Sequence, residues 1–109
     1  MQLIPVGRLV LTSGGGSAQT LTMASSLYKK YHINAELLSG SPAAGTTTVY
    51  CTPAGGSREQ VTYGGSALNF DPTSPKSFSL NAPIKSVDFT PSGWTANVSI
   101  VVTAFAEVD

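Results

Sequence analysis

The sequence predicts an all-β protein, an antiparallel β-sandwich or jelly-roll-like barrel of about seven to eight short strands. Turn-forming residues recur at intervals of about 8–12 residues, which is the spacing of strands in sandwiches and barrels. Several segments between these turns alternate apolar and polar side chains with a period of two, as half-buried strands do. Hydroxyl side chains are frequent, with 14 Ser and 12 Thr among 109 residues, whereas charged residues make up only 11%. This composition is typical of a strand-rich protein whose solvent faces carry hydroxyl groups.

Turn signals divide the chain into these segments. They are Gly14-Gly15-Gly16, Gly40-Ser41-Pro42, Pro53-Ala54-Gly55-Gly56, Gly64-Gly65, Asp71-Pro72, Ala82-Pro83 and Pro91-Ser92-Gly93. The glycines at 14–16 are too few for a domain linker, so we expect a mobile loop after the first strand. The length of the chain fits one domain, and we expect residues 1–109 to form a single β-sandwich.

The expected strands cover residues 3–13, 31–39, 46–52, 60–63, 77–80, 85–90 and 96–108. In "YHINAELLS", Tyr31 and Ile33 share one face while His32 and Asn34 share the other, the alternation of a half-buried strand. Residues 46–52 and 85–90 alternate in the same way. The last two segments flank the turn "TPSGWT", and we expect them to pair as a β-hairpin.

The stretch "TLTMASSLYKKY" permits two interpretations. Its apolar residues recur with nearly helical spacing, Thr22 is a suitable N-cap, and most residues from Ala24 to Lys30 are good or neutral helix formers. One short helix over residues 22–30 is therefore one interpretation, and two short strands are the other.

The final strand, "NVSIVVTAFAEVD", is apolar on more than one side. One face carries Val98, Ile100, Val102, Ala104, Ala106 and Val108, and the opposite face carries Ser99, Val101, Thr103, Phe105 and Glu107. The first face belongs to a core. On the second face, the apolar side chains of Val101 and Phe105 are bordered by polar groups. Such a surface indicates a contact with another protein, unless a second sheet or the N-terminal strand covers it.

The charge pattern excludes several function classes. Six basic and six acidic residues give a net charge of zero, and they are scattered singly, so we expect no nucleic-acid partner. No apolar run approaches the length of about 20 residues that spans a bilayer, and the start shows no Ala-x-Ala cleavage site. The single cysteine, Cys51, has no partner for an internal disulfide, which suits folding in a reducing cytoplasm. So few charges favour a protein that exists assembled.

The sequence offers little catalytic or metal-binding chemistry. His32 is the sole histidine, so a multi-histidine metal site is not available, and we expect it to be a polar residue on a solvent-facing strand position. Cys51 lies in an alternating strand and is expected to be a buried structural thiol. Paired carboxylates are the remaining enzymatic option, but no spacing marks a pair; the candidates are Glu36, Glu59, Asp71 and Asp88. We therefore expect a protein that is not an enzyme and has no cofactor.

The aromatic residues allow an alternative function. Trp94 in a turn, together with tyrosines, could form a stacking platform for sugars, as in a small carbohydrate-binding module. The tyrosines are Tyr28, Tyr31, Tyr50 and Tyr63. The competing interpretation is that Trp94 packs over the edge of the core at the end of a strand.

The segment "APIKSVDFTPSGWTANVSIVVTAFA", in a short chain that is low in charge and poor in cysteine, resembles small structural proteins of tailed bacteriophages. The resemblance is greatest to capsid decoration or cement proteins and less to head–tail joining proteins. It implies a non-enzymatic protein of the virion, made in the host cytoplasm, that binds the major capsid protein or other virion subunits and forms homo-oligomers. Our candidate interface residues are Val101, Phe105 and Trp94, with Leu3, Ile4 and Val6 of an N-terminal segment that Pro5 suits to an extended arm.

Overall fold

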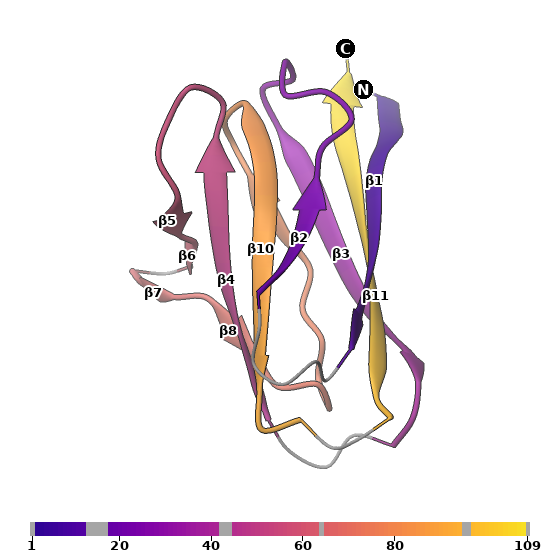
Figure 1. Cartoon of the computed structure of the whole chain (residues 1–109). Helices are drawn as coiled ribbons and strands as arrows, with labels where there is room; N and C mark the ends of the chain where they lie inside the picture. The colour runs from indigo at the N-terminus through magenta and orange to yellow at the C-terminus, as the bar shows by residue number, and fades with distance from the viewer. Residues whose placement is uncertain (1, 13–17, 42–44, 64, 95–96, 109) are drawn as a thin grey trace.

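The computed structural model describes residues 2–12, 18–41, 45–63, 65–94 and 97–108, and within these ranges it contains strands and no helix. The loop expected at residues 14–16 lies outside them. The strands, shown in Figure 1, are β1 (Gln2–Thr12), β2 (Gln19–Thr22), β3 (Tyr31–Ser39), β4 (Thr46–Pro53), β5 (Glu59–Gln60), β6 (Thr62–Tyr63), β7 (Ser66–Ala67), β8 (Asn69–Phe70), β9 (Phe78–Leu80), β10 (Ile84–Ser92) and β11 (Ser99–Val108).

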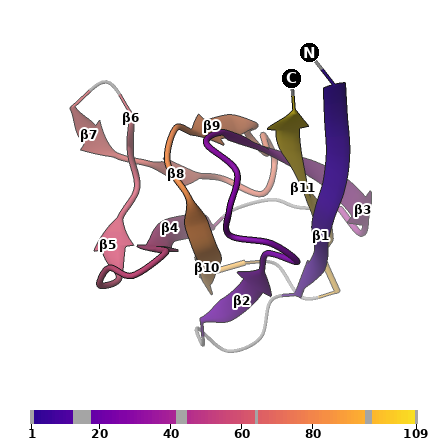
Figure 2. The ribbon, with the colours of Figure 1, turned by 90° about the horizontal axis from the view of Figure 1, so that it is seen from above.

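Two antiparallel sheets face each other, as Figures 1 and 2 show. Sheet A has the strand order β1-β11-β3-β9. Sheet B has the order β2-β10-β4-β5, and β8 also pairs with β4. The short strands β6 and β7 form a separate pair beside sheet B. The predicted all-β sandwich is confirmed.

The order of the strands is that of a jelly roll. Strands β1 to β4 alternate between sheets A and B, and β9, β10 and β11 alternate again. In sheet A, the last strand, β11, lies between β1 and β3, and in sheet B, β10 lies between β2 and β4. Strands from the second half of the chain are thus inserted between strands from the first half. Two sheets connected in this way are the double Greek key of jelly rolls.

The core lies between the sheets and is built from alternate residues of the long strands. The inward face of β11 matches the expectation, because Ile100, Val102, Ala104 and Ala106 are fully buried. From sheet B, Val87 of β10 and other apolar side chains pack against them in one cluster. Burial of each large side chain contributes about 1.5–3 kcal/mol, which makes this shared cluster the main stabilising element.

The predicted hairpin between the last two long strands is wrong. β10 pairs with β2 and β4 in sheet B, whereas β11 pairs with β1 and β3 in sheet A. Both strands point their apolar residues at the same core from opposite sides. Alternation fixes which side chains face inward and does not identify the hydrogen-bonded neighbour, so the pattern was compatible with either arrangement.

The helix considered for residues 22–30 is not formed. Backbone groups there bond to distant strands instead, since Met23 N donates to the carbonyl of Lys85 and Ala24 N donates to the carbonyl of Val6. The rest of the loop is held by Tyr31, whose fully buried side chain bonds the backbone of the loop. Tertiary partners therefore override a weak local helix propensity.

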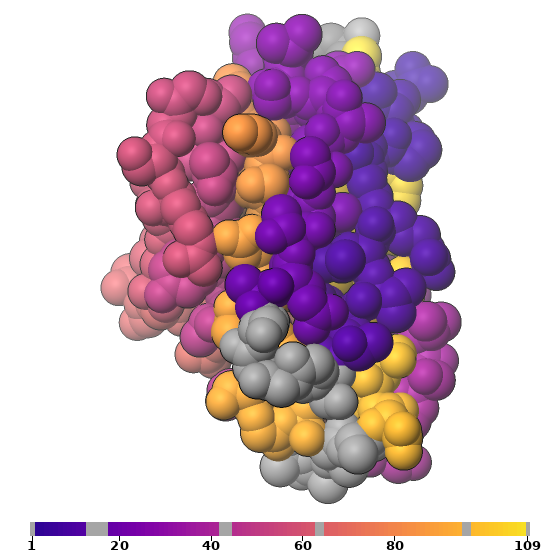
Figure 3. Space-filling model, in the orientation of Figure 1, coloured from indigo at the N-terminus to yellow at the C-terminus, as the bar shows by residue number. Residues whose placement is uncertain are grey.

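The N-terminal segment is a strand and not a free arm. β1 pairs with β11 from Gln2 to Thr12, with a register shift at Val6 between Pro5 and Gly7. The side chain of Val6 is 5% exposed and belongs to the core, and Ile4 is partly buried against it. Pro5 fits this position because β1 is an edge strand. In Figure 3, the surfaces of β1 and β2 adjoin and close this side of the sandwich.

Among the described residues, no helix could cross a membrane.

Candidate contact face on sheet A

The outward side of sheet A brings together residues from four segments. We call it the contact face, and its members are Leu3, Pro5, Arg8 and Val10 on β1, Val101, Thr103, Phe105 and Glu107 on β11, His32, Asn34 and Glu36 on β3, and Ser77 and Ser79 at β9. The register sets three cross-strand rows. Pro5, Phe105, His32 and Ser79 form the first row, Arg8, Thr103 and Asn34 the second, and Val10, Val101 and Glu36 the third.

None of the described segments covers the apolar residues of this face. Val101 and Phe105 are only partly buried, and Leu3 is 46% exposed. Sheet B covers the opposite side of sheet A, and β1 lies beside β11 and not over it. Of the two alternatives weighed for Val101 and Phe105, coverage by a second sheet or by the N-terminal strand is therefore excluded for the described residues.

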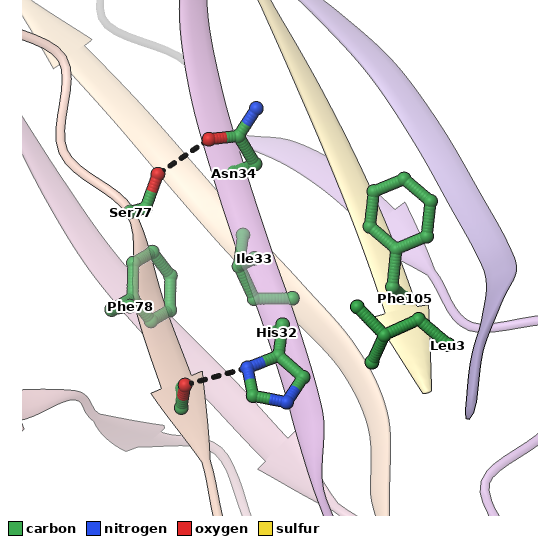
Figure 4. A pocket seen from close by; sticks show the side chains of 8 residues that line it. Leu3, His32, Ile33, Asn34, Ser77, Phe78 and Phe105 are labelled. Atoms are coloured by element: carbon green, nitrogen blue, oxygen red, sulfur yellow. Dashed lines mark hydrogen bonds between the residues drawn. The ribbon is translucent and has the colours of Figure 1, made fainter. Parts of the chain in front are cut away.

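A shallow hollow of about 370 Å³ opens on the contact face. Figure 4 shows Leu3 and Phe105 on one side of it, Ser77 and Phe78 on the other, and β3 with His32 between them. The remaining lining residues are Ile33, Asn34 and Ser79. The volume falls within the range of small-molecule sites, about 300–1,000 Å³, although the hollow is open to solvent and not enclosed.

Polar side chains bordering the hollow are bonded to one another. Ser77 Oγ donates to Asn34 Oδ1 at 2.5 Å. His32 Nδ1 lies 3.0 Å from Ser79 Oγ, and His32 Nε2 lies 3.4 Å from Glu107 Oε2. The Nζ of Lys30 lies 3.9 Å from the same carboxylate oxygen. These contacts fix the orientation of the imidazole and compensate the charge of Glu107 on this half-exposed surface.

The contacts from Ser79 to His32 and from His32 to Glu107 superficially resemble the nucleophile, base and acid of a catalytic triad. The register accounts for it, because His32 and Ser79 are direct cross-strand partners, and such pairs interact in any sheet. A hydrolase also needs preorganised donors aimed at the oxyanion. The side chains of Ser77 and Asn34, which line the same hollow, are bonded to each other. The expected placement of His32 on a solvent-facing strand position is confirmed.

The outward side of sheet B has a different character. Its central strands present Ser86, Asp88 and Thr90 opposite Thr52, Tyr50 and Thr48. Thr20 donates a 2.8 Å hydrogen bond to Asp88, and Arg58 Nε donates one of 2.7 Å to the same carboxylate. The guanidinium of Arg58 also lies 3.9 Å from the centre of the Tyr50 ring. This side thus presents hydroxyl groups and the Arg58–Asp88 ion pair, in which the two charges compensate each other.

Trp94 lies away from the contact face. It follows the end of β10, is partly buried against the core, and its Nε1 donates to the carbonyl oxygen of Thr46 at 3.1 Å and to Thr47 Oγ1 at 3.0 Å. The packing interpretation of Trp94 therefore agrees with its position.

The three tyrosines whose side chains are described do not gather around Trp94. Tyr31 is fully buried, Tyr28 packs edge-on against Tyr31 in the loop before β3, and Tyr50 lies under Arg58 on sheet B. The side chain of Tyr63 lies outside the described part of the chain. The described aromatic residues thus form no common platform.

The remaining candidates for chemistry are dispersed. Cys51 is buried, as expected, and desolvation together with the nearby carboxylates of Glu59 and Asp88 raises the pKa of its thiol. Glu36 and Glu59 belong to different sheets. Asp71 accepts hydrogen bonds from the backbone and hydroxyl of Thr73, which lower its pKa. In the part of the chain that is described, no group of three His, Cys, Asp or Glu residues could hold a metal ion.

Comparison of the chain with protein-family models, curated proteins and solved structures gives no match. The contact face is accordingly interpreted from its own residues. The sequence pattern identified Val101, Phe105 and Leu3 of this face but gave no signal for Arg8, Val10 or the β9 hydroxyls. Alternation had placed the polar residues of β3 on one side, but only the strand order shows that β3 neighbours β11.

Proposed function

We propose that this protein is a non-enzymatic structural component of a bacteriophage particle, a capsid decoration or cement protein that joins its neighbours through the contact face. The observation that carries the proposal is the difference between the two outer faces of the sandwich. Sheet A exposes Leu3, Val101 and Phe105, whereas the outer side of sheet B carries hydroxyl groups and the Arg58–Asp88 pair. Partly apolar surfaces bordered by polar groups are typical of protein interfaces.

The energetic scale supports assembly at many copies. Burying one Phe and one Val at a contact contributes about 3–5 kcal/mol before ordering costs are subtracted. Such a contact is weak by itself. Repetition over a symmetric shell adds avidity, so modest contacts suffice to hold a decoration protein on its lattice.

Fold and composition agree with this function without defining it. Jelly rolls occur in viral capsid domains as well as in lectins. A chain with 11% charged residues and zero net charge has little electrostatic repulsion to keep free copies apart, which favours an assembled state.

Substitution of Phe105 by Asp tests the proposal, with Thr90→Asp as the matched control. Both residues are partly buried on outward strand positions, one on each sheet, so both variants add one carboxylate to a solvent-facing surface. We expect Phe105→Asp to remove co-sedimentation with capsids of the phage that encodes the protein, while Thr90→Asp retains it. Circular dichroism verifies that both variants are folded. Equal binding of Phe105→Asp and wild type would contradict the proposal.

A further inference from the structure

We infer that the occupant of the contact face is a second copy of this chain, which packs face to face around a two-fold axis parallel to β11. The inference deepens the proposed function and rests on its assignment of the contact face as an assembly surface. Two features make this face complementary to itself: the position of two charges that form no ion pair among the described residues, and the placement of a ridge and a hollow. Its size indicates how strong the contact can be.

The strand order determines what such an axis superimposes. β11 lies between β1 and β3, so a two-fold rotation about a line along β11 places β11 over β11 and β1 of one copy over β3 of the other. Sheets packed face to face are about 10 Å apart, and their strands remain nearly aligned. Phe105 and Val101 of the two copies then meet at the axis. The contact is isologous, which is the commonest symmetry of protein dimers.

Arg8 and Glu36 provide the charge complementarity. Both are exposed, and among the described residues neither takes part in an ion pair within the chain. They flank β11 from opposite sides, Arg8 in the row of Asn34 and Glu36 in the next row. The rotation places Arg8 of one copy over Asn34 of the other, about 7 Å along the strand from Glu36. These long side chains can span that separation, and the symmetry forms the pair twice.

The apolar ridge on β1 and the part of the hollow over β3 and β9 also lie on opposite sides of β11. Leu3 and Pro5 are exposed on β1, and Leu3 forms one edge of the hollow. From there the hollow extends past Phe105 and His32 (Figure 4) to Ser79 of β9, in the row of Pro5. The rotation sets the ridge of each copy above the hollow of the other. A ridge and a hollow that meet by symmetry permit closer packing than two flat sheets.

The size of the face predicts a weak dimer. Four strands at a spacing of about 4.8 Å and a length of about ten residues at 3.3 Å each give at most about 600 Å² per copy. The pair would bury at most about 1,200 Å² in total, the lower end for specific interfaces. Interfaces at this end of the range are typical of weak, transient encounters, and the outermost contacts here are exposed charge pairs. We therefore expect a dissociation constant of about 1–100 μM.

Charge reversal at the two positions tests the inference. Arg8→Glu and Glu36→Arg each turn both intermolecular attractions into repulsions, so each variant alone should dimerise about 10- to 100-fold more weakly than wild type in sedimentation velocity. An equimolar mixture of the two variants should recover a dimer, because both contacts in the mixed pair join opposite charges. Lys85→Glu, an exposed residue on sheet B, makes the same change in net charge as Arg8→Glu and should dimerise like wild type.

The outcomes separate the inference from the proposed function. A wild-type protein that remains monomeric up to about 1 mM, or a mixture that dimerises no better than its components, would overturn the two-fold contact. If the wild-type protein is monomeric in solution but still binds capsids, the proposed function stands while the inference fails. If the charge variants behave as expected but capsids bind none of the proteins, the dimer stands and the role in the particle fails.

Discussion

Removal of one hydroxyl from the core tests how the loop between β2 and β3 is held. Tyr31 is fully buried, and its Oη donates to the carbonyl of Ser25 at 2.8 Å and accepts from the backbone N–H of Tyr28 at 3.2 Å. Tyr31→Phe keeps the ring but leaves both backbone groups without this partner. Each lost bond costs about 0.5–1.5 kcal/mol, and partial access of water to the loop favours the lower half, so we expect a total loss of about 1–2 kcal/mol.

This loss should be measurable in both chemical and thermal unfolding. With about 2.1 cal/mol/K per residue, a chain of 109 residues has an unfolding entropy of about 0.23 kcal/mol/K, so the melting temperature should fall by about 4–9 °C. Tyr28→Phe is the control, because Tyr28 lies in the same loop and its hydroxyl bonds to none of the described residues. A Tyr31→Phe variant within about 0.3 kcal/mol of wild type would refute the role of this hydroxyl.

Two further predictions concern a glycine and the thiol. Gly45 has φ +126°, and an added Cβ would lie 2.7 Å from Trp94 Cδ1, whereas Gly55 has φ +75° and open space around it. Gly55→Ala should therefore cost about 1 kcal/mol in urea denaturation and Gly45→Ala at least about 1 kcal/mol more; equal losses would contradict the clash. Because the pKa of the Cys51 thiol is raised in the folded state, the unfolded chain loses the thiol proton at a lower pH than the folded protein does. The stability contributed by the thiol is thus present below its unfolded pKa of about 8.5 and is lost as pH rises through the folded value. Denaturation between pH 8 and 10 should show a decline that Cys51→Ala reduces, and identical slopes would count against it.

Local patterns predicted the long strands well because each is an independent amphipathic segment. The alternation in residues 31–39 defined β3 with its observed bounds, and the apolar face of β11 was assigned correctly. β2 overlaps the stretch for which two short strands were one of two interpretations, and the sequence could not decide between them because its four residues are too short to show a period and merge with the loop that follows. The strand expected over residues 60–63 is divided into β5 and β6. The pairing of β5 and β8 with β4 was not predicted, since two-residue strands are defined by their partner and not by their own sequence.

The contact face was predictable only in part. The outward position of Val101 and Phe105 follows from the period of two within one strand. The proximity of Arg8, Glu36 and the β9 hydroxyls to these residues depends on strand order, which is set by long-range nesting of the two sheets. The placement of Val6 was misjudged because the bulge beside Pro5 turns the residue into the core, and a one-residue shift in a strand exchanges its faces.

The central claim is that the contact face, and not the hydroxyl-covered side of sheet B, is the surface through which this protein assembles. Sedimentation velocity of wild type, Phe105→Asp and Thr90→Asp over the same concentration series tests it most directly. We predict that wild type and Thr90→Asp associate over the same range of concentration, while Phe105→Asp remains a folded monomer. Association of Phe105→Asp at the wild-type concentration would contradict the account.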